Sequence, residues 1–182
     1  MTIQTPIANA YWVQPGKILA GEYPAFVGVD EAAQRLEALL GAGVTLFLDL
    51  TQEYEHHVPP YAALLAEIAE QRKQRVQHVR MGIRDMNAPT VDFMHEIQRT
   101  LEIALEQGET VYIHCMGGIG RTGTVVGCYL VENGRTGEQA IEEIATLRQG
   151  IPSAKHKSPE TSAQRALIIN WRVEGIERQA AR

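Results

Sequence analysis

The pattern of apolar and polar positions along the chain predicts alternating strands and helices. The run VTLFLDL (residues 44–50) is almost continuously apolar and rich in β-branched and aromatic residues, as expected for a strand buried on both faces. The segment TVDFMHEIQRTLEIALEQG instead repeats apolar residues at helical spacing, which predicts an amphipathic helix. Those apolar residues are Met94, Ile97, Leu101 and Leu105. Thr90 is the expected N-cap of this helix, and Gly108 follows its C-terminus.

The rest of the pattern predicts further elements on both sides of these two. Short strands are expected about the Pro15–Gly16 turn, over RVQHVRM and over TVYIHC, and helices over VDEAAQRLEALLGAG and over PPYAALLAEIAEQRK, which proline opens. Only helices are expected after TVYIHC: one begins at a capping box of Thr136 and Gln139, and a last one opens with Ser158 and Pro159. This order predicts an α/β fold, with residues 1–182 forming a single domain around a central, mostly parallel sheet flanked by helices.

Length, charge and composition predict a soluble globular protein and exclude several other classes of protein. The chain has 182 residues, enough for one domain with a real core, and its formal net charge of -5 argues against nucleic-acid binding through a basic surface. The N-terminal MTIQTPIANAYW has neither the basic nor the apolar region of a secretory signal, and no apolar run approaches the ~18 residues of a membrane span. We therefore expect a cytoplasmic monomer with no membrane or nucleic-acid partner.

The stretch VYIHCMGGIGRTGTVVG (residues 111–127) carries the chemistry, and it satisfies two different rules. Gly118, Gly120 and Gly123 match G-x-G-x-x-G, the dinucleotide-binding fingerprint. That fingerprint requires a second strand ending in an acidic residue about 20 residues on, but residues 142–143 lie within a helical pattern. A Walker-type nucleotide loop is excluded because no G-K-[ST] is present. The dinucleotide interpretation is therefore disfavoured.

The second rule, a cysteine followed six positions later by an arginine, explains every residue type in the loop. Cys115 stands between a strand and a helix N-terminus, whose free N–H groups and dipole favour the nucleophilic thiolate. Arg121 supplies a planar fork for two phosphate oxygens, and Thr122 can donate a hydrogen bond to the sulfur. The backbone amides between them can converge on an anion, with glycines allowing its close approach. These substrate-binding residues are Met116, Gly117, Gly118, Ile119 and Gly120.

The stretch VYIHCMGGIGRTGT resembles the H-C-x5-R-[ST] loop of the protein tyrosine phosphatase superfamily, in a form similar to the small atypical dual-specificity phosphatases. The segment YWVQPGKILAGEYP is similar to the W-V-x-P-G-x-L-A-G opening of such enzymes, so the resemblance extends over most of the chain. The position of the cysteine loop late in the chain separates it from the low-molecular-weight phosphatases. The resemblance implies hydrolysis of phosphoprotein monoesters through a cysteinyl-phosphate intermediate, without a metal or other cofactor.

Such a mechanism needs a general acid, and the chain contains four aspartates. Asp30 and Asp92 fit helix N-termini, where an acid stabilises the dipole. Asp49 ends a strand and could either lie at the site or orient the loop. Asp85 lies in the loop MGIRDMNAP, which carries the acid in the family, and is the matching position. The charge of Arg84 would favour the ionised form of Asp85, so we expect Arg84 to point elsewhere.

Three other polar positions have weaker assignments. Gln164 lies where some relatives place a glutamine near the attacking water, although a solvated helix residue fits the sequence equally well. His114 is expected to shape the loop through a backbone hydrogen bond. His56 and His57 suggest a metal, but without a carboxylate or histidine partner at ligand spacing they are interpreted as part of a polar loop.

The substrate stays open at this point. Phosphotyrosine, with phosphoserine and phosphothreonine as further candidates, is what the family implies. Phosphoinositide phosphatases similar to this family tend to carry lysines in the loop, whereas Met116–Gly120 is uncharged. An RNA 5′-phosphatase is disfavoured by the acidic balance. A phosphoprotein-binding module would not require Cys115, and redox sensing would need a better-placed partner than Cys128, which is expected in the core.

Overall fold

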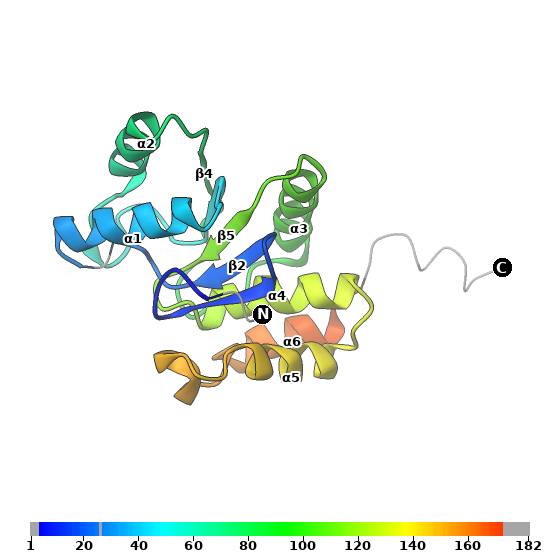
Figure 1. Ribbon diagram of the computed structural model, residues 1–182. Coiled ribbons are helices and arrows are strands. Elements are labelled where there is room, and N and C mark those ends of the chain that lie inside the picture. Colours follow the sequence, from blue (N-terminus) through cyan, green and yellow to red (C-terminus); the bar gives the residue numbers. More distant parts are fainter. Residues whose placement is uncertain (1–3, 26, 173–182) are drawn as a thin grey trace.

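Five strands form one central sheet in the computed structural model, which describes residues 4–25 and 27–172 of the chain (Figure 1). The strands are β1 (Ala10–Gln14), β2 (Ile18–Gly21), β3 (Leu46–Asp49), β4 (Gln77–Arg80) and β5 (Val111–His114). Their order in the sheet is β1-β2-β5-β3-β4. Only β1 runs antiparallel to its neighbour, while the pairs β2–β5, β5–β3 and β3–β4 are parallel. The predicted α/β class and mostly parallel sheet are confirmed.

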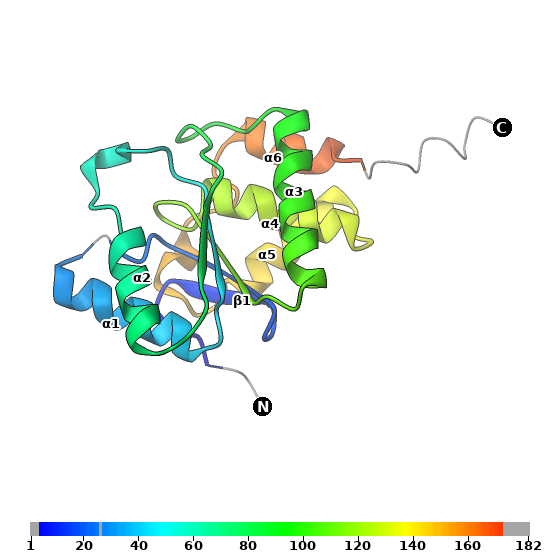
Figure 2. The same cartoon turned by 90° about the horizontal axis from the view of Figure 1, so that it is seen from above.

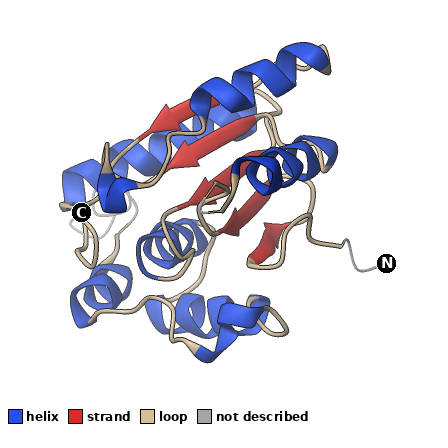
Figure 3. Ribbon diagram, turned by 90° about the vertical axis from the view of Figure 1, so that its left-hand side faces the viewer, coloured by secondary structure: helices blue, strands red, loops and turns tan. Residues whose placement is uncertain are grey.

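Helices cover both faces of this sheet. They are α1 (Val29–Gly41), α2 (Ala62–Gln71), α3 (Val91–Glu106), α4 (Gly120–Glu132), α5 (Gly137–Leu147) and α6 (Ser162–Asn170), with short 3-10 turns η1 (Glu55–His57) and η2 (Pro152–Lys155). Seen from above, α1 and α2 lie on one side of the strands and α3 to α6 on the other (Figure 2). Figure 3 shows the same layers with the strands between them. Among the described helices, none combines the length and the apolar composition that a membrane span requires.

The side-chain alternation of the strands explains the two layers. In β3, Leu46 and Leu48 join the core cluster built with α3 to α6, whereas Phe47 joins the cluster built with α1 and α2. Tyr112 of β5 likewise packs on the α1–α2 side. Successive strand residues point to opposite faces, so a strand covered on both sides must be apolar throughout. The uninterrupted apolar run seen in the sequence therefore corresponds to a central strand.

Most of the predicted helix boundaries hold. The Thr90 hydroxyl accepts a hydrogen bond of 3.2 Å from the backbone N–H of Phe93, which confirms it as the N-cap of α3. The capping box of Thr136 and Gln139 at α5 is also present. In contrast, proline does not open α2: the helix begins at Ala62, after the N-cap Tyr61.

The prediction for the last helix was wrong at its start. Helix α6 begins at Ser162, and its N-cap is Thr161, which forms a capping box with Gln164. The reason is that Thr161 and Gln164 also have the three-residue spacing of a capping box, which gives this cap two hydrogen bonds. Ser158 serves the cysteine loop instead, donating a 2.7 Å hydrogen bond to the carbonyl of Ile119.

Candidate active site

The glycine-rich loop lies where β5 ends and α4 begins, at the edge of the sheet where the parallel strands have their carboxyl ends. Two of its carbonyls accept hydrogen bonds from residues outside the loop. Met116 O accepts from the N–H of Tyr23 at 2.9 Å, and Ile119 O accepts from Ser158 Oγ at 2.7 Å. Within the described part of the chain, the N–H groups of residues 116–119 donate no hydrogen bond. The loop therefore has the free donors that an anion-binding nest requires.

Two glycines of the loop are required by their surroundings. Gly118 has φ +67°, and a Cβ atom there would overlap the backbone of Gly21 on β2. A Cβ at Gly120 would lie 2.6 Å from Oε2 of Glu160 and 3.0 Å from Nε2 of Gln164. The loop therefore packs between β2 and the segment leading into α6, and side chains at these two positions would force it open.

Cys115, the first residue after β5, is only 3% exposed and packs in the apolar core cluster. Thr122 lies in the first turn of α4 with its Oγ1 buried and without a hydrogen-bond partner among the described residues. The predicted hydrogen bond from this hydroxyl to the sulfur is thus not formed here, although the hydroxyl remains available. Cys128 is fully buried, as expected, and burial raises the pKa of its thiol well above the ordinary value.

Arg121 is buried at 2% exposure and paired with a residue that the sequence did not reveal. Glu55 of η1 accepts two hydrogen bonds from it, Nη1 to Oε2 at 2.7 Å and Nη2 to Oε1 at 2.6 Å. Nη1 also donates to the carbonyl of Ile83 at 3.0 Å. Burial alone would lower the pKa of Arg121, but Glu55, with Cys115 and Asp85, more than offsets this effect, so the pKa lies above its ordinary value. The guanidinium is therefore a fixed cation whose orientation Glu55 sets.

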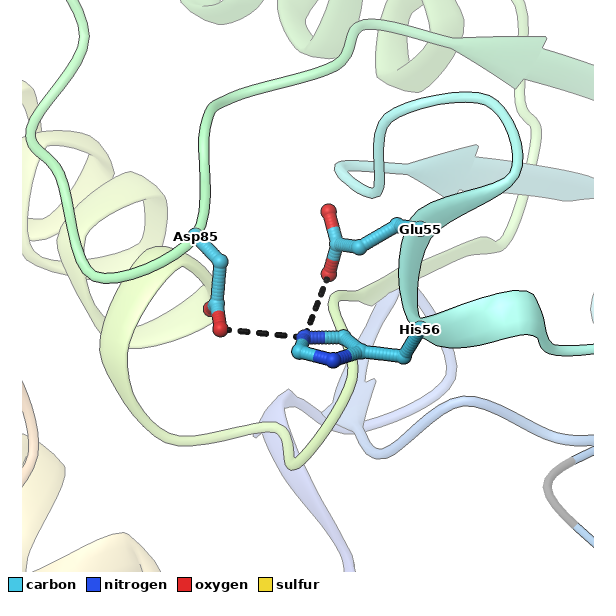
Figure 4. A group of neighbouring side chains, drawn as sticks. All are labelled: Glu55, His56 and Asp85. Carbon is cyan, nitrogen blue, oxygen red and sulfur yellow. Dashed lines mark hydrogen bonds and ion pairs between the residues drawn. The ribbon is translucent and has the colours of Figure 1, made fainter.

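Asp85 meets the same guanidinium from the loop after β4, with Oδ1 at 2.9 Å from Nη2 of Arg121. Its Oδ2 lies 3.1 Å from Nε2 of His56 (Figure 4). The side chain is 41% exposed, so the carboxyl borders solvent at the edge of the site. Its ionic partners are thus Arg121 and His56 rather than the exposed Arg84.

The expectation that His56 has no carboxylate partner was wrong. Glu55, His56 and Asp85 each present a ligand atom, and these atoms all lie within 4.8 Å of one another, an arrangement that could hold a metal ion. Asp85 comes from a loop far along the chain, which is why spacing did not reveal it. However, Arg121 already pairs with both carboxylates. A guanidinium in hydrogen-bond contact with both acids repels a second cation, so the cluster is best described as an ion-pair network.

Asp49 is buried beneath the loops of the site and binds residues of β4 and of the segment after β3. It is fully buried, and Oδ1 accepts from the N–H and the hydroxyl of Thr51 at 2.9 and 2.6 Å. Oδ2 lies 3.1 Å from Nε2 of His78 and accepts from Arg80 at 3.2 Å. Burial raises the pKa of Asp49, but His114, His78 and Thr51 together bring it well below its ordinary value. Of the two roles considered, this network favours the orienting one.

His114 shapes the loop, as predicted. Its Nδ1 lies 3.2 Å from the carbonyl of Cys115, and its Nε2 lies 2.6 Å from the hydroxyl of Tyr61. Burial raises the pKa of Tyr61 well above its ordinary value, so this hydroxyl stays protonated and donates a hydrogen bond to Nε2. Burial also lowers the pKa of His114 despite the nearby Asp49. The ring is therefore neutral and donates its Nδ1–H to the backbone beside the sulfur.

Gln164 is fully buried, so the reading as a solvated helix residue was wrong. Its Oε1 accepts from the N–H groups of Glu160 and Thr161, both at 3.1 Å. Its Nε2 donates to the carbonyl of Asn87 in the loop that carries Asp85, at 3.2 Å. Gln164 thus joins α6 to the acid loop beside the glycine-rich loop, a position compatible with the predicted contact to water.

Comparison with known proteins places the chain in a family of phosphatases. Residues 25–135, more than half of the chain, match the family described as "Polymorphic toxin system, DSP-PTPase phosphatase" (Tc-R-P). A putative tyrosine phosphatase of Invertebrate iridescent virus 3 is 32% identical over 119 residues, which are 63% of this chain and 42% of that protein. The phosphatidylglycerophosphatase and protein-tyrosine phosphatase 1 of Mus musculus is 30% identical over 118 residues, 62% of this chain and 57% of its own length. This chain thus spans about half the length of these curated relatives.

Among solved structures, Tk-PTP in the active form superposes with a TM-score of 0.66 at 26% identity, covering 91% of this chain and 98% of that one. The matched family region contains Asp85, Cys115 and Arg121, the three residues that the fold brings to one edge of the sheet. With its fold, its cysteine loop and its matched region in agreement, the chain belongs to the DSP-PTPase phosphatase family Tc-R-P, within the protein tyrosine phosphatase superfamily.

Proposed function

We propose that this chain hydrolyses phosphate monoesters of phosphoproteins, phosphotyrosine above all, through a cysteinyl-phosphate intermediate. The observation that carries the proposal is the contact of 2.9 Å between Asp85 and Arg121. It joins the candidate acid to the phosphate-binding arginine of the cysteine loop across 36 residues of sequence. Such a convergence gives one small site a nucleophile, an anion-binding cation and a carboxyl group. Arg121 alone favours the ionised carboxyl, whereas a phosphate dianion bound between them favours the protonated form that the first step needs.

In the first step the thiolate of Cys115 attacks the phosphorus in line. The free N–H groups of Met116–Ile119 and the guanidinium of Arg121 hold the three equatorial oxygens, where negative charge spreads in the transition state. The bond from phosphorus to the ester oxygen breaks while Asp85 gives its proton to that oxygen. The products are the free alcohol or phenol, a phosphorylated Cys115 and an ionised Asp85.

In the second step water hydrolyses the phosphorylated cysteine. Asp85, now ionised, takes a proton from the water as its oxygen attacks phosphorus, and the sulfur–phosphorus bond breaks. Thr122 donates a hydrogen bond from its unpartnered hydroxyl to the departing sulfur. Gln164 positions the water through the second N–H of its amide nitrogen, whose first N–H donates to Asn87. Inorganic phosphate leaves and the site returns to its starting protonation state. The chain's own residues cover every role.

The rim of the site suits an aromatic or peptide substrate. Tyr54 and Met86, two of the most exposed large apolar side chains in the described residues, precede Glu55 and follow Asp85, respectively. Tyr54 is 77% exposed and Met86 is 52% exposed. Exposed apolar side chains next in sequence to Glu55 and Asp85 can offer contacts to a phenyl ring or a peptide side chain.

A non-protein ester is the second candidate, because the mouse relative is named both a phosphatidylglycerophosphatase and a protein-tyrosine phosphatase. The uncharged loop residues Met116–Gly120 favour the protein substrate, since a lipid headgroup with several phosphates gains from added lysines. A module that only binds phosphoproteins is disfavoured by the presence of Cys115 beside Arg121 and Asp85.

The test is phosphate release from matched phosphotyrosine, phosphoserine and phosphothreonine peptides, without added metal, by the wild type and by Cys115→Ser. We expect release from the phosphotyrosine peptide that disappears in the variant, and the ratio among peptides gives the specificity. Release only from phosphoinositides or phosphatidylglycerophosphate would select the second candidate. Tight peptide binding without any release would select the binding module.

We also propose that residues 1–182 act as one catalytic domain that is monomeric and located in the cytoplasm. The site is assembled within one chain, because its side chains come from segments of this chain that meet at one edge of the sheet: η1, the loop after β4, the cysteine loop and the starts of α4 and α6. Light scattering at several protein concentrations tests the oligomeric state, and fractionation of cells expressing the protein tests the location. A stable dimer or a membrane-associated fraction would contradict this part of the proposal.

A further inference from the structure

His56 contacts the candidate acid at the carboxyl oxygen that does not face Arg121, and Figure 4 shows this imidazole beside Asp85 and Glu55. Its Nε2 lies 3.1 Å from Oδ2 of Asp85 and 3.6 Å from Oε1 of Glu55. The other oxygen of Asp85, Oδ1, faces Arg121 at 2.9 Å. The carboxyl is thus held at both oxygens, one toward the phosphate-binding arginine and one toward the imidazole.

The backbone around His56 is unusual in a way that favours this contact. His56 has φ +51°, and its neighbours Tyr54 and His57 have φ +59° and +53°. Residues other than glycine adopt this left-handed region at a cost of about 1–2 kcal/mol each, and such positions persist only where the surroundings determine them. In this conformation the side chains of Glu55 and His56 both point toward the side chain of Asp85 (Figure 4).

We propose that His56 is a positioning residue for the general acid, an inference that rests on the proposed role of Asp85. An imidazole that donates Nε2–H to Oδ2 leaves the transferable proton of Asp85 on Oδ1. Because Oδ1 faces Arg121, that proton points toward the bound phosphate and the leaving oxygen. When phosphate oxygens replace Oδ1 at Arg121, the contact with His56 keeps the acid at the site.

The test compares leaving groups, because a general acid matters most when the departing oxygen is basic. Phenyl phosphate releases phenoxide, whereas a difluorinated umbelliferyl phosphate releases an anion that departs without a proton. For His56→Asn, which retains tolerance for the left-handed backbone but shortens the reach, we expect kcat on phenyl phosphate to fall about tenfold. On the umbelliferyl ester we expect less than a twofold change. His56→Gln, whose amide N–H can extend to the place of Nε2, should restore most of the rate.

His57→Asn is the matched control, because His57 is also left-handed and exposed but makes no contact with Asp85 in the described structure. It should leave both substrates unchanged. Thermal melting of each variant checks folding. An equal loss on both substrates in His56→Asn would indicate a structural role only and overturn the inference, as would a loss of the same size in His57→Asn.

A double-mutant cycle of Asp85→Asn and His56→Asn separates this inference from the proposed function. Asp85→Asn alone should lower kcat on phenyl phosphate ~100-fold or more and spare the umbelliferyl ester. Adding His56→Asn to Asp85→Asn should then cause no further loss, because the group to be positioned is gone. If Asp85→Asn shows no leaving-group dependence, the acid assignment fails and this inference with it. If Asp85→Asn behaves as expected while His56→Asn has no effect, only the inference about His56 fails.

Discussion

The carboxylate of Glu55 and the guanidinium of Arg121 form a bidentate salt bridge, with nitrogen–oxygen distances of 2.6 and 2.7 Å. Both side chains are almost fully buried, at 7% and 2% exposure. The pair uses Nη1 and Nη2, and no described residue accepts from Nε, which leaves that donor for a phosphate oxygen. In the proposed function, an arginine held in this way by Glu55 presents a fixed edge to the phosphate, and only the contact with Asp85 has to give way.

Removing the charge of this partner should weaken catalysis and stability together. Glu55→Gln keeps one oxygen acceptor but leaves the buried cation with only the partly exposed Asp85 as counterion, so we expect the unfolding free energy to fall by about 1–3 kcal/mol. The loosened arginine should lower kcat/KM about 100-fold, because small displacements of a positioning group have effects of that size. Steady-state kinetics and thermal melting measure the two effects.

Glu53→Gln is the control for this prediction, because Glu53 is an exposed acid two residues earlier in the same loop. It removes the same charge from the loop without touching Arg121. A kcat/KM in Glu55→Gln that matches the value in Glu53→Gln would mean that the pair does not position the arginine.

The close approach of Gly118 to Gly21 makes the cysteine loop sensitive to a single methyl group. Gly118→Ala would place a Cβ on the backbone of β2 at a positive φ, so we expect a loss of about 1–3 kcal/mol of stability and at least a tenfold loss of activity. Gly117→Ala is the matched control, because its Cβ would meet Ile119 Cδ1 at an ordinary 3.5 Å. Chemical denaturation and phosphate release compare the two. Equal effects in both variants would contradict the geometric explanation.

The parts of the fold that depend on local pattern could be predicted from the sequence. The run around Phe47 is apolar because β3 is covered on both faces, and the loop from Cys115 to Arg121 carries its chemistry in consecutive residues. The caps Thr90 and Thr136 likewise act within one turn of chain. In each case the residues that interact are close in sequence, so spacing alone indicates the contact.

The parts that depend on distant segments were missed for a matching reason. Glu55 and His56 lie in a stretch that looks like a polar loop, and only the sheet topology brings the ends of β3, β4 and β5 to one edge. The order of the strands therefore had to be known before Asp85 could be placed beside Glu55. The predicted start of α6 was wrong because Ser158 and Thr161 are both suitable N-cap residues. The choice between them depends on the hydrogen bond from Ser158 to the distant Ile119.

Substitutions of Gln164 can separate its part in the fold from its part in catalysis. Gln164→Glu keeps an oxygen to accept from the N–H groups of Glu160 and Thr161, but loses the donor to Asn87. If the amide positions the attacking water, hydrolysis of the intermediate slows and phosphorylated Cys115 accumulates. We expect a burst of phenol on mixing followed by a steady rate about tenfold lower. A lower rate without a burst would mean that only the first step, through the acid loop, depends on Gln164.

The neutral His114 should make stability depend on pH near neutrality. Burial lowers the pKa of His114 in the folded protein, whereas in the unfolded chain a histidine titrates near its ordinary value of about 6.5. As the pH falls, the unfolded state therefore binds a proton before the folded state does. Below pH ~6.5 the free energy of unfolding decreases by up to about 1.4 kcal/mol per pH unit. In His114→Asn, which cannot be protonated, this part of the slope should disappear. Urea unfolding at pH 7.5, 6.5 and 5.5 measures it, with the exposed His156→Asn as control. The same slope in His114→Asn as in the wild type would show that another group carries the pH dependence.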